Sequence, residues 1–141
     1  MGNDLNFKKI IHNGREYAII IDGNDLPEGL KFYTENDKFV QVASWKYNGG
    51  HTTKPHSHKI SERTSNITQE LVYVKKGSLK ATLYSNNEEI ISTKILKEGM
   101  CILIFRGGHK YEILEDNTEV FEVKNGPYPG IEKDKKTIEH E

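Results

Sequence analysis

Glu-Leu-Val-Tyr-Val-Lys-Lys-Gly-Ser-Leu-Lys-Ala-Thr-Leu-Tyr, residues 70–84, is the stretch that decides the fold class. Its first half is rich in β-branched and aromatic residues, and in its second half apolar residues alternate with polar ones. Both patterns are typical of β-strands, in which successive side chains point to opposite faces. Gly77, which lies between the two halves, indicates a turn. The stretch therefore predicts two consecutive strands with a tight turn between them.

The same organisation extends in both directions along the chain. Residues 39–47 and 118–123 also read as strands, and between residues 39 and 124 most turn signals recur every 8–13 residues. This spacing favours a β-sandwich or a β-barrel. Residues 59–69 are polar and contain no strand-like run, so we expect a long loop there. Residues 10–11 and 17–21 are expected to form a hairpin around Asn13-Gly14.

Length and charge exclude several classes of protein. The chain has 141 residues, which suits one domain, and its 20 basic and 21 acidic side chains give a net charge of −1. We therefore expect no broad attraction to nucleic acid or to an anionic membrane. The single cysteine, Cys101, excludes an intrachain disulfide, and we expect it to be an inert buried thiol. Together with the lack of a signal-peptide pattern, it leads us to expect a cytoplasmic protein.

Three ionisable side chains lie before or at the start of residues 70–84. His56 and His58 form a His-x-His pair, which on a strand would point both imidazoles to one face. Glu70 shares a face with Val72 and Val74, and an ionised carboxylate on a core face is costly without a cation beside it. The alternative is that Glu70 points to solvent at the strand end and that the histidines are ordinary surface residues.

The spacing of these residues resembles the two motifs of the cupin superfamily. The residues that match the first motif are Gly50, His56, His58, Glu70 and Gly77, and those that match the second are Gly99, Gly107 and His109. Two departures stand out. Eleven residues separate His58 from Glu70, which is longer than the family gap, and the second motif is one residue short, with Phe105 where the family has proline.

The resemblance implies an all-β, single-domain jelly-roll barrel (a double-stranded β-helix) and a homodimer. Strands in residues 1–38 would precede a barrel core in residues 39–126, and residues 127–141 would form a tail, all within one structural domain. The family's metal ligands correspond to His56, His58, Glu70 and His109. Three imidazoles and one carboxylate suit divalent Fe, Mn, Ni, Co or Zn, and they leave coordination positions open for water or substrate.

Further residues are candidates for substrate contacts. Two of the three arginines, Arg63 and Arg106, fall in the motif region, where a guanidinium would suit an anionic substrate, although both could be solvated loop charges. Tyr111 shares a face with His109 and either contacts substrate or lines the interior. We expect His51 to lie at the surface or beside the metal ligands, and His12 and His140 to be solvated.

Three functions remain open at this point. The first is a metal-dependent enzyme acting on a small polar or anionic metabolite, with dioxygenase chemistry or isomerase and lyase chemistry on small sugars and acids as the expectation from the resemblance. The second is a non-catalytic module that binds a small ligand or is stabilised by its metal. The third is a metal-free protein whose site has been lost.

Overall fold

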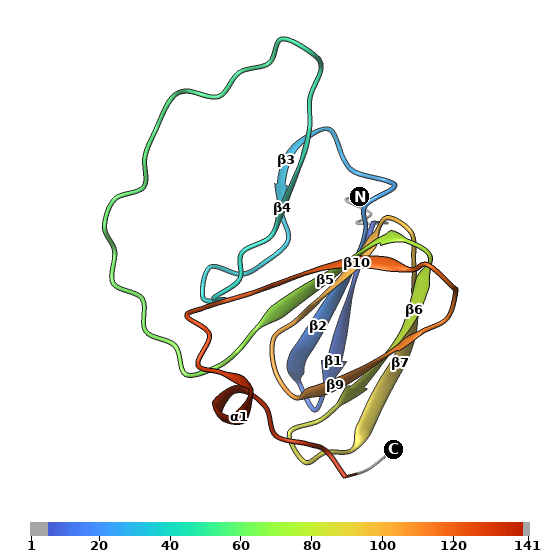
Figure 1. Cartoon of the computed structure of the whole chain (residues 1–141). Coiled ribbons are helices and arrows are strands. Elements are labelled where there is room, and N and C mark those ends of the chain that lie inside the picture. The colour runs from blue at the N-terminus through green and yellow to red at the C-terminus, as the bar shows by residue number, and fades with distance from the viewer. Residues whose placement is uncertain (1–5, 140–141) are drawn as a thin grey trace.

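The structure is a computed structural model that describes residues 6–139, and nearly all of their regular secondary structure is β (Figure 1). The strands are β1 (Phe7–His12), β2 (Arg15–Asp22), β3 (Gly29–Phe32), β4 (Ala43–Lys46), β5 (Glu70–Lys76), β6 (Ser78–Tyr84), β7 (Ile90–Lys97), β8 (Met100–Ile104), β9 (Gly108–Ile113) and β10 (Glu119–Lys124). One short helix, α1 (Ile131–Asp134), lies near the carboxy-terminal end. The two strands expected from residues 70–84 are β5 and β6, and Gly77 between them has a φ of 84°.

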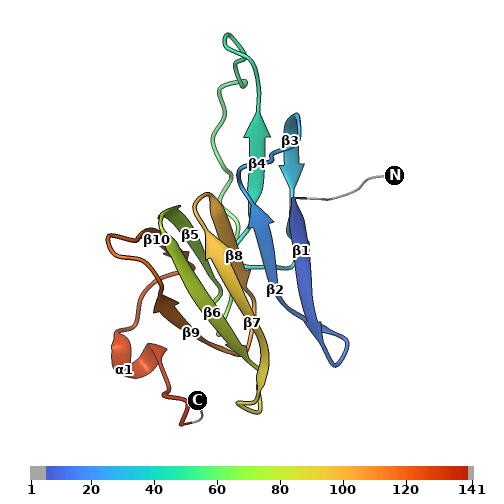
Figure 2. The same cartoon turned by 90° about the vertical axis from the view of Figure 1, so that its right-hand side faces the viewer.

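The strands form three antiparallel sheets. A five-stranded sheet has the order β1-β2-β8-β5-β10, a three-stranded sheet has the order β7-β6-β9, and β3 pairs with β4. The three-stranded sheet lies against one face of the five-stranded sheet, and the β3–β4 hairpin extends beyond its end (Figure 2). The all-β prediction is confirmed. The sheets of residues 6–139 do not close into a barrel, because β9 and β10 each end their sheet without a further strand beside them.

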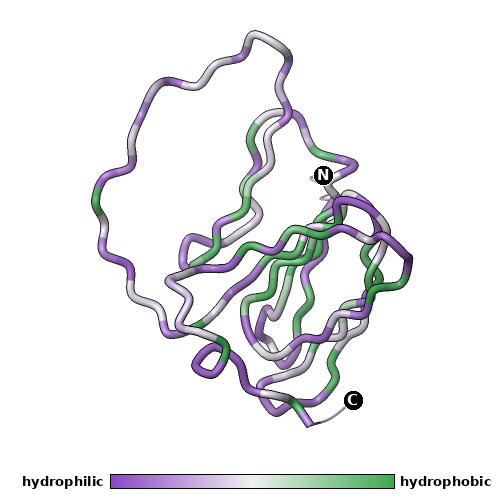
Figure 3. The backbone as a smooth tube through the Cα atoms, in the orientation of Figure 1, coloured by the Kyte–Doolittle hydropathy of each residue, from purple (hydrophilic) through white to green (hydrophobic). Residues whose placement is uncertain are grey.

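Two apolar clusters lie on opposite faces of the five-stranded sheet. Ala18 and Ile20 of β2 point into the cluster shared with the three-stranded sheet, whereas Ile19 and Ile21 point into a second cluster with Tyr33. β8 alternates in the same way between the two clusters. These two central strands are therefore buried on both faces, which explains their uninterrupted apolar sequences and the apolar colouring concentrated on the inner strands in Figure 3.

The expected amino-terminal hairpin is present. β1 and β2 pair antiparallel with His12 opposite Arg15, and the connecting Asn13 and Gly14 have φ values of 50° and 73°. Positive φ at both central residues is the geometry that Asn-Gly favours in a two-residue hairpin turn.

The long loop is larger than the sequence indicated. Residues 47–69 contain no regular secondary structure, and residues 47–68 form a wide, exposed arc away from the sheets (Figure 1). The strand expected over residues 39–47 is shortened to β4, because the backbone N–H groups of Phe39 and Val40 donate to the Gln69 side-chain oxygen at 2.8 and 3.2 Å instead of joining a sheet. In residues 6–139, no helix is both long enough and apolar enough to cross a membrane.

Candidate functional site

Glu70 opens β5 and points into the protein. The residue is 6% exposed, and it lies on the same face as the buried Val72 and Val74, whereas Tyr73 on the other face is 37% exposed. The expectation that Glu70 shares the core face of its strand is therefore confirmed. The alternation of β5 leaves its carboxylate at the end of the apolar cluster between the two larger sheets.

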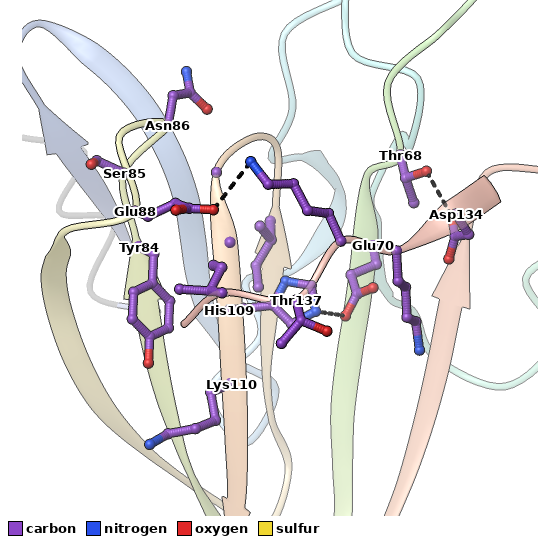
Figure 4. A pocket seen from close by; sticks show the side chains of 16 residues that line it. Thr68, Glu70, Tyr84, Ser85, Asn86, Glu88, His109, Lys110, Asp134 and Thr137 are labelled. Atoms are coloured by element: carbon purple, nitrogen blue, oxygen red, sulfur yellow. Dashed lines mark hydrogen bonds and ion pairs between the residues drawn. The ribbon is translucent and has the colours of Figure 1, made fainter. Parts of the chain in front are cut away.

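The Glu70 carboxylate meets two side chains from β9, a strand of the opposite sheet. Its Oε2 lies 3.1 Å from His109 Nε2 and accepts a hydrogen bond from the Tyr111 hydroxyl at 3.0 Å. His109 and Tyr111 are two residues apart on β9, so both point to the same face, as expected, and their rings are 5.0 Å apart. Figure 4 shows the His109 ring facing Glu70 across the space between the two strands.

These contacts keep the buried carboxylate charged. Burial by itself raises the pKa of Glu70, but the hydrogen bond and charge of His109, together with the Tyr111 hydrogen bond, outweigh it and bring the pKa below its ordinary value. The Tyr111 phenol behaves in the opposite way: burial and the neighbouring Glu70 charge raise its pKa far above the usual value. Tyr111 therefore stays a neutral hydrogen-bond donor to an anionic Glu70.

His109 has one ring nitrogen without a partner. Its Nδ1 is buried and makes no hydrogen bond to any residue from 6 to 139. Because buried polar atoms are nearly always hydrogen-bonded, such an atom indicates a partner that residues 6–139 do not supply, such as water or a ligand.

A cavity of about 560 Å³ adjoins this group. Glu70 and His109 line it together with Lys110, Glu88 and the segment of residues 134–138. Two interactions hold that segment over the cavity: the Thr68 hydroxyl donates to Asp134 at 3.2 Å, and Lys136 lies 3.2 Å from Glu88 (Figure 4). The sequence reasoning missed this wall because nothing local in residues 134–138 indicates which strands they contact.

His56 and His58 lie away from this group. They are exposed in the irregular segment of residues 47–69, not on a strand, with their rings 5.6 Å apart and the His56 Nδ1 2.8 Å from the Lys54 carbonyl. His51 is exposed in the same segment and stacks on Tyr47. The structure therefore brings together Glu70 and His109 but not the other two predicted ligands. No group of three or more His, Cys, Asp or Glu side chains placed to hold a metal occurs in residues 6–139.

The remaining candidates have varied positions. Arg63 is exposed in the same segment, where its guanidinium donates to the Ser61 carbonyl at 3.3 Å, and it does not line the cavity. Cys101 is buried as expected, and burial raises the pKa of its thiol to about 11, which makes it unreactive at neutral pH. His12 is partly exposed beside Tyr17, and His140 lies outside the described residues.

Comparisons of the chain with protein-family models, with curated proteins and with solved structures found no match. The site itself is therefore the basis for the proposed function.

Proposed function

We propose that this chain binds a small polar or anionic metabolite in the cavity beside Glu70 and His109, next to one divalent transition metal. The observation that carries the proposal is the buried, ionised Glu70, which is held by an imidazole and a phenol at the wall of a cavity. A charged carboxylate in an apolar setting is costly, and proteins retain one mainly where it has a task.

Glu70 and His109 suit a metal in chemistry and in spacing. Carboxylate oxygen and imidazole nitrogen are common ligands of divalent transition metals. Two donors bonded to one six-coordinate ion at about 2.0–2.2 Å lie roughly 3 Å apart, and the Glu70 oxygen and His109 nitrogen are 3.1 Å apart. An ion bound between these two atoms would replace the hydrogen bond that joins them, and the unpartnered His109 Nδ1 stays open to water or a ligand.

His56 and His58 complete the proposed ligand set after a movement of residues 47–64, while residues 67–69 stay bonded to Asn125. The six residues between His58 and Ser65 allow the chain to span up to roughly 25 Å when extended. The outer edge of β9 pairs with no strand of the described residues, and an edge of this kind accepts an added strand. An extended residue 51–60 segment at that edge would bring both imidazoles to the side of the sheet that carries His109.

The same movement would bring this fold closer to the closed jelly-roll of the cupins. β10 also ends its sheet, and its apolar residues Val120, Phe121 and Val123 are exposed. Strands added at the β9 and β10 edges would pair with the free backbone groups there and extend the two larger sheets toward a closed barrel. The homodimer and the cytoplasmic location stay predictions.

The residues around the cavity define what the site can do. A divalent ion held there would polarise a carbonyl or activate a water molecule. Lys110 and Lys135 line the cavity, form no ion pair within the described residues and can attract an anionic group, while the neutral Tyr111 hydroxyl keeps the Glu70 carboxylate in position. A metal-dependent enzyme and a non-catalytic binding module both fit this arrangement.

Elemental analysis of the purified protein tests the metal centre. We expect close to one transition metal per chain, and a loss of most of it in Glu70→Gln and in the double variant His56→Ala/His58→Ala. His51→Ala is the matched control, because it removes an imidazole from the same segment at a position outside the proposed ligand set, and it should keep its metal.

Retention of the metal in both ligand variants would rule out this site. Turnover separates the two functional classes: a metal-loaded protein that consumes oxygen with, or isomerises, a small acid or sugar is an enzyme. A loaded protein that binds such compounds without converting them is a binding module.

A further inference from the structure

A second cavity adjoins the first, with which it shares Asp134 of α1, and its lining is strongly basic. It has a volume of about 880 Å³ and is bounded by residues 65–69, 105–107 and 124–129 and by α1. Its charged lining residues are Arg15, Arg106, Lys124, Lys133 and Asp134, four cations against one carboxylate. We propose that this cavity binds a small molecule through a phosphate group.

The carboxylates near the cavity are already engaged. Glu16, whose backbone carbonyl contacts Arg106, carries its own carboxylate 3.3 Å from Lys9. Asp134 accepts from Thr68 and lies 3.5 Å from Lys124. Asp37 is close enough for the Arg106 charge to affect it, but it pairs with Lys38 at 2.8 Å. These pairs leave the positive charge of the arginines largely uncompensated.

Arg106 is held in place for binding an oxyanion. Its Nε donates to the Glu16 carbonyl at 3.1 Å, and the residue is only partly exposed. This bond fixes one edge of the planar guanidinium and leaves its terminal nitrogens free for a second acceptor. Arg15 and Lys133 form no ion pair with any residue of the described part of the chain, so two further cations are available.

The walls of the cavity are tied to each other by hydrogen bonds. The Asn125 side chain accepts from the Gln69 N–H at 2.8 Å and donates to the Ile67 carbonyl at 3.1 Å, while the Asn125 N–H donates to the Gln69 carbonyl at 3.3 Å. Three bonds thus join residues 67–69 to the end of β10. A cavity held in this way is formed before a ligand arrives, which lowers the entropic cost of binding.

The charge and the composition point to phosphate. Two of the three arginines of the chain line this cavity, and guanidinium groups bind phosphate oxygens in pairs. The lining residues carry an excess of three positive charges, which Glu122, 3.7 Å from Lys124, reduces to two. This excess suits a group that carries about two negative charges, as a phosphate monoester does near neutral pH. The volume is larger than one phosphate requires, so the expected ligand is a phosphorylated metabolite rather than the free ion.

This site does not depend on the proposed metal centre. The two cavities share Thr68, Asn86, Gly107 and Asp134 as a common wall, but Glu70 and His109 line only the first, and Arg15 and Arg106 line only the second. A variant of Glu70 should therefore leave phosphate binding unchanged.

Isothermal titration calorimetry at fixed ionic strength tests the proposal, with inorganic phosphate, pyrophosphate and citrate as probes. We expect pyrophosphate to bind more tightly than phosphate, and Arg15→Ala and Arg106→Ala each to weaken pyrophosphate binding by about tenfold or more. Arg106→Lys keeps the positive charge but loses the planar guanidinium with its paired N–H donors, so it should also weaken binding. Lys8→Ala removes an exposed cation from β1, outside the cavity, and Glu70→Gln removes the other site; both should stay within about twofold of the unaltered protein.

Three results would overturn the proposal. They are no detectable binding of pyrophosphate at millimolar concentration, an equal loss of affinity in Lys8→Ala, and citrate binding as tight as pyrophosphate, which would assign the cavity to carboxylates. An unchanged urea midpoint for Arg106→Lys shows that a loss of binding is not a loss of folding.

Discussion

At the scale of single residues, the burial of the Glu70 carboxylate carries a high energetic cost. A buried carboxylate loses its hydration, and charge-assisted hydrogen bonds from His109 and Tyr111, together with the charge of Lys124, offset that loss. Neither partner is near Glu70 in the sequence, since both lie about forty positions further on in β9. The alternation of β5 accounts for the burial of Glu70, and the opposite sheet supplies what makes that burial tolerable.

Tyr111→Phe should destabilise the protein. The substitution keeps the ring in the apolar cluster but removes one hydrogen bond to the buried carboxylate. We expect the free energy of unfolding to fall by about 1.5–3 kcal/mol, the usual range for a hydrogen bond to a charged group. Urea unfolding followed by circular dichroism measures the change.

Tyr73→Phe provides the matched control on β5. Tyr73 points to the exposed face of its strand, and its hydroxyl has no hydrogen bond within residues 6–139. The unfolding free energy should therefore change by less than about 0.5 kcal/mol. Equal effects of the two substitutions would mean that the Tyr111–Glu70 bond contributes nothing to stability.

At the scale of elements, the turns decide how closely the strands approach one another. Gly107 connects β8 to β9 with a φ of 77°, and a side chain there would run into the Tyr84 carbonyl oxygen and the Tyr17 ring. Because this connection carries the chain from one sheet to the other, it sets the position of His109, the second residue of β9.

Gly107→Ala should be strongly destabilising. The contacting oxygen belongs to the backbone and cannot move aside, and the left-handed conformation is itself unfavourable for alanine. Overpacking of this kind costs about 1–3 kcal/mol, which the shift of the thermal or urea midpoint measures. Gly49→Ala in the exposed segment, where an added methyl meets nothing within 4 Å, should leave the midpoint unchanged. A wild-type midpoint for Gly107→Ala would contradict the close approach of β6 to this turn.

At the scale of the whole molecule, the five-stranded sheet is the structural centre. β2 and β8 are covered on one face by the three-stranded sheet and on the other by Tyr33 and its neighbours. The β3–β4 hairpin has only four residues in each strand and exposes Leu30, Phe32 and Trp45. Stability should therefore be uneven, with the centre most resistant to opening.

Native-state hydrogen exchange should resolve this difference. We expect the amides of β2 and β8 to exchange only through global unfolding, and those of β3 and β4 to exchange through local opening at a much lower free energy. Both sets can be read in one experiment on the unaltered protein, so each serves as the control for the other. Equal protection of the two sets would mean that the hairpin unfolds together with the core.

Local patterns were sufficient for most of the strands. The alternation in residues 79–83, the β-branched run in 71–74 and the Asn13-Gly14 turn each depend on neighbours in the chain, and each is found as expected in β6, β5 and the β1–β2 hairpin. The strand expected over residues 39–47 was confirmed only over residues 43–46, because a side chain thirty positions away, Gln69, takes the hydrogen bonds of Phe39 and Val40.

By itself, the sequence determined that this protein is all-β, that Glu70 lies on the same strand face as Val72 and Val74, and that Cys101 is buried, because strand periodicity and hydrophobicity act over a few neighbouring residues. Only the tertiary structure decided that His109 and Tyr111 meet Glu70, that His56 and His58 lie apart from it, and that residues 134–138 wall the cavity. Those contacts join segments tens of residues apart. Their formation depends on how the sheets pack and on which edges find partners, and no local pattern encodes either.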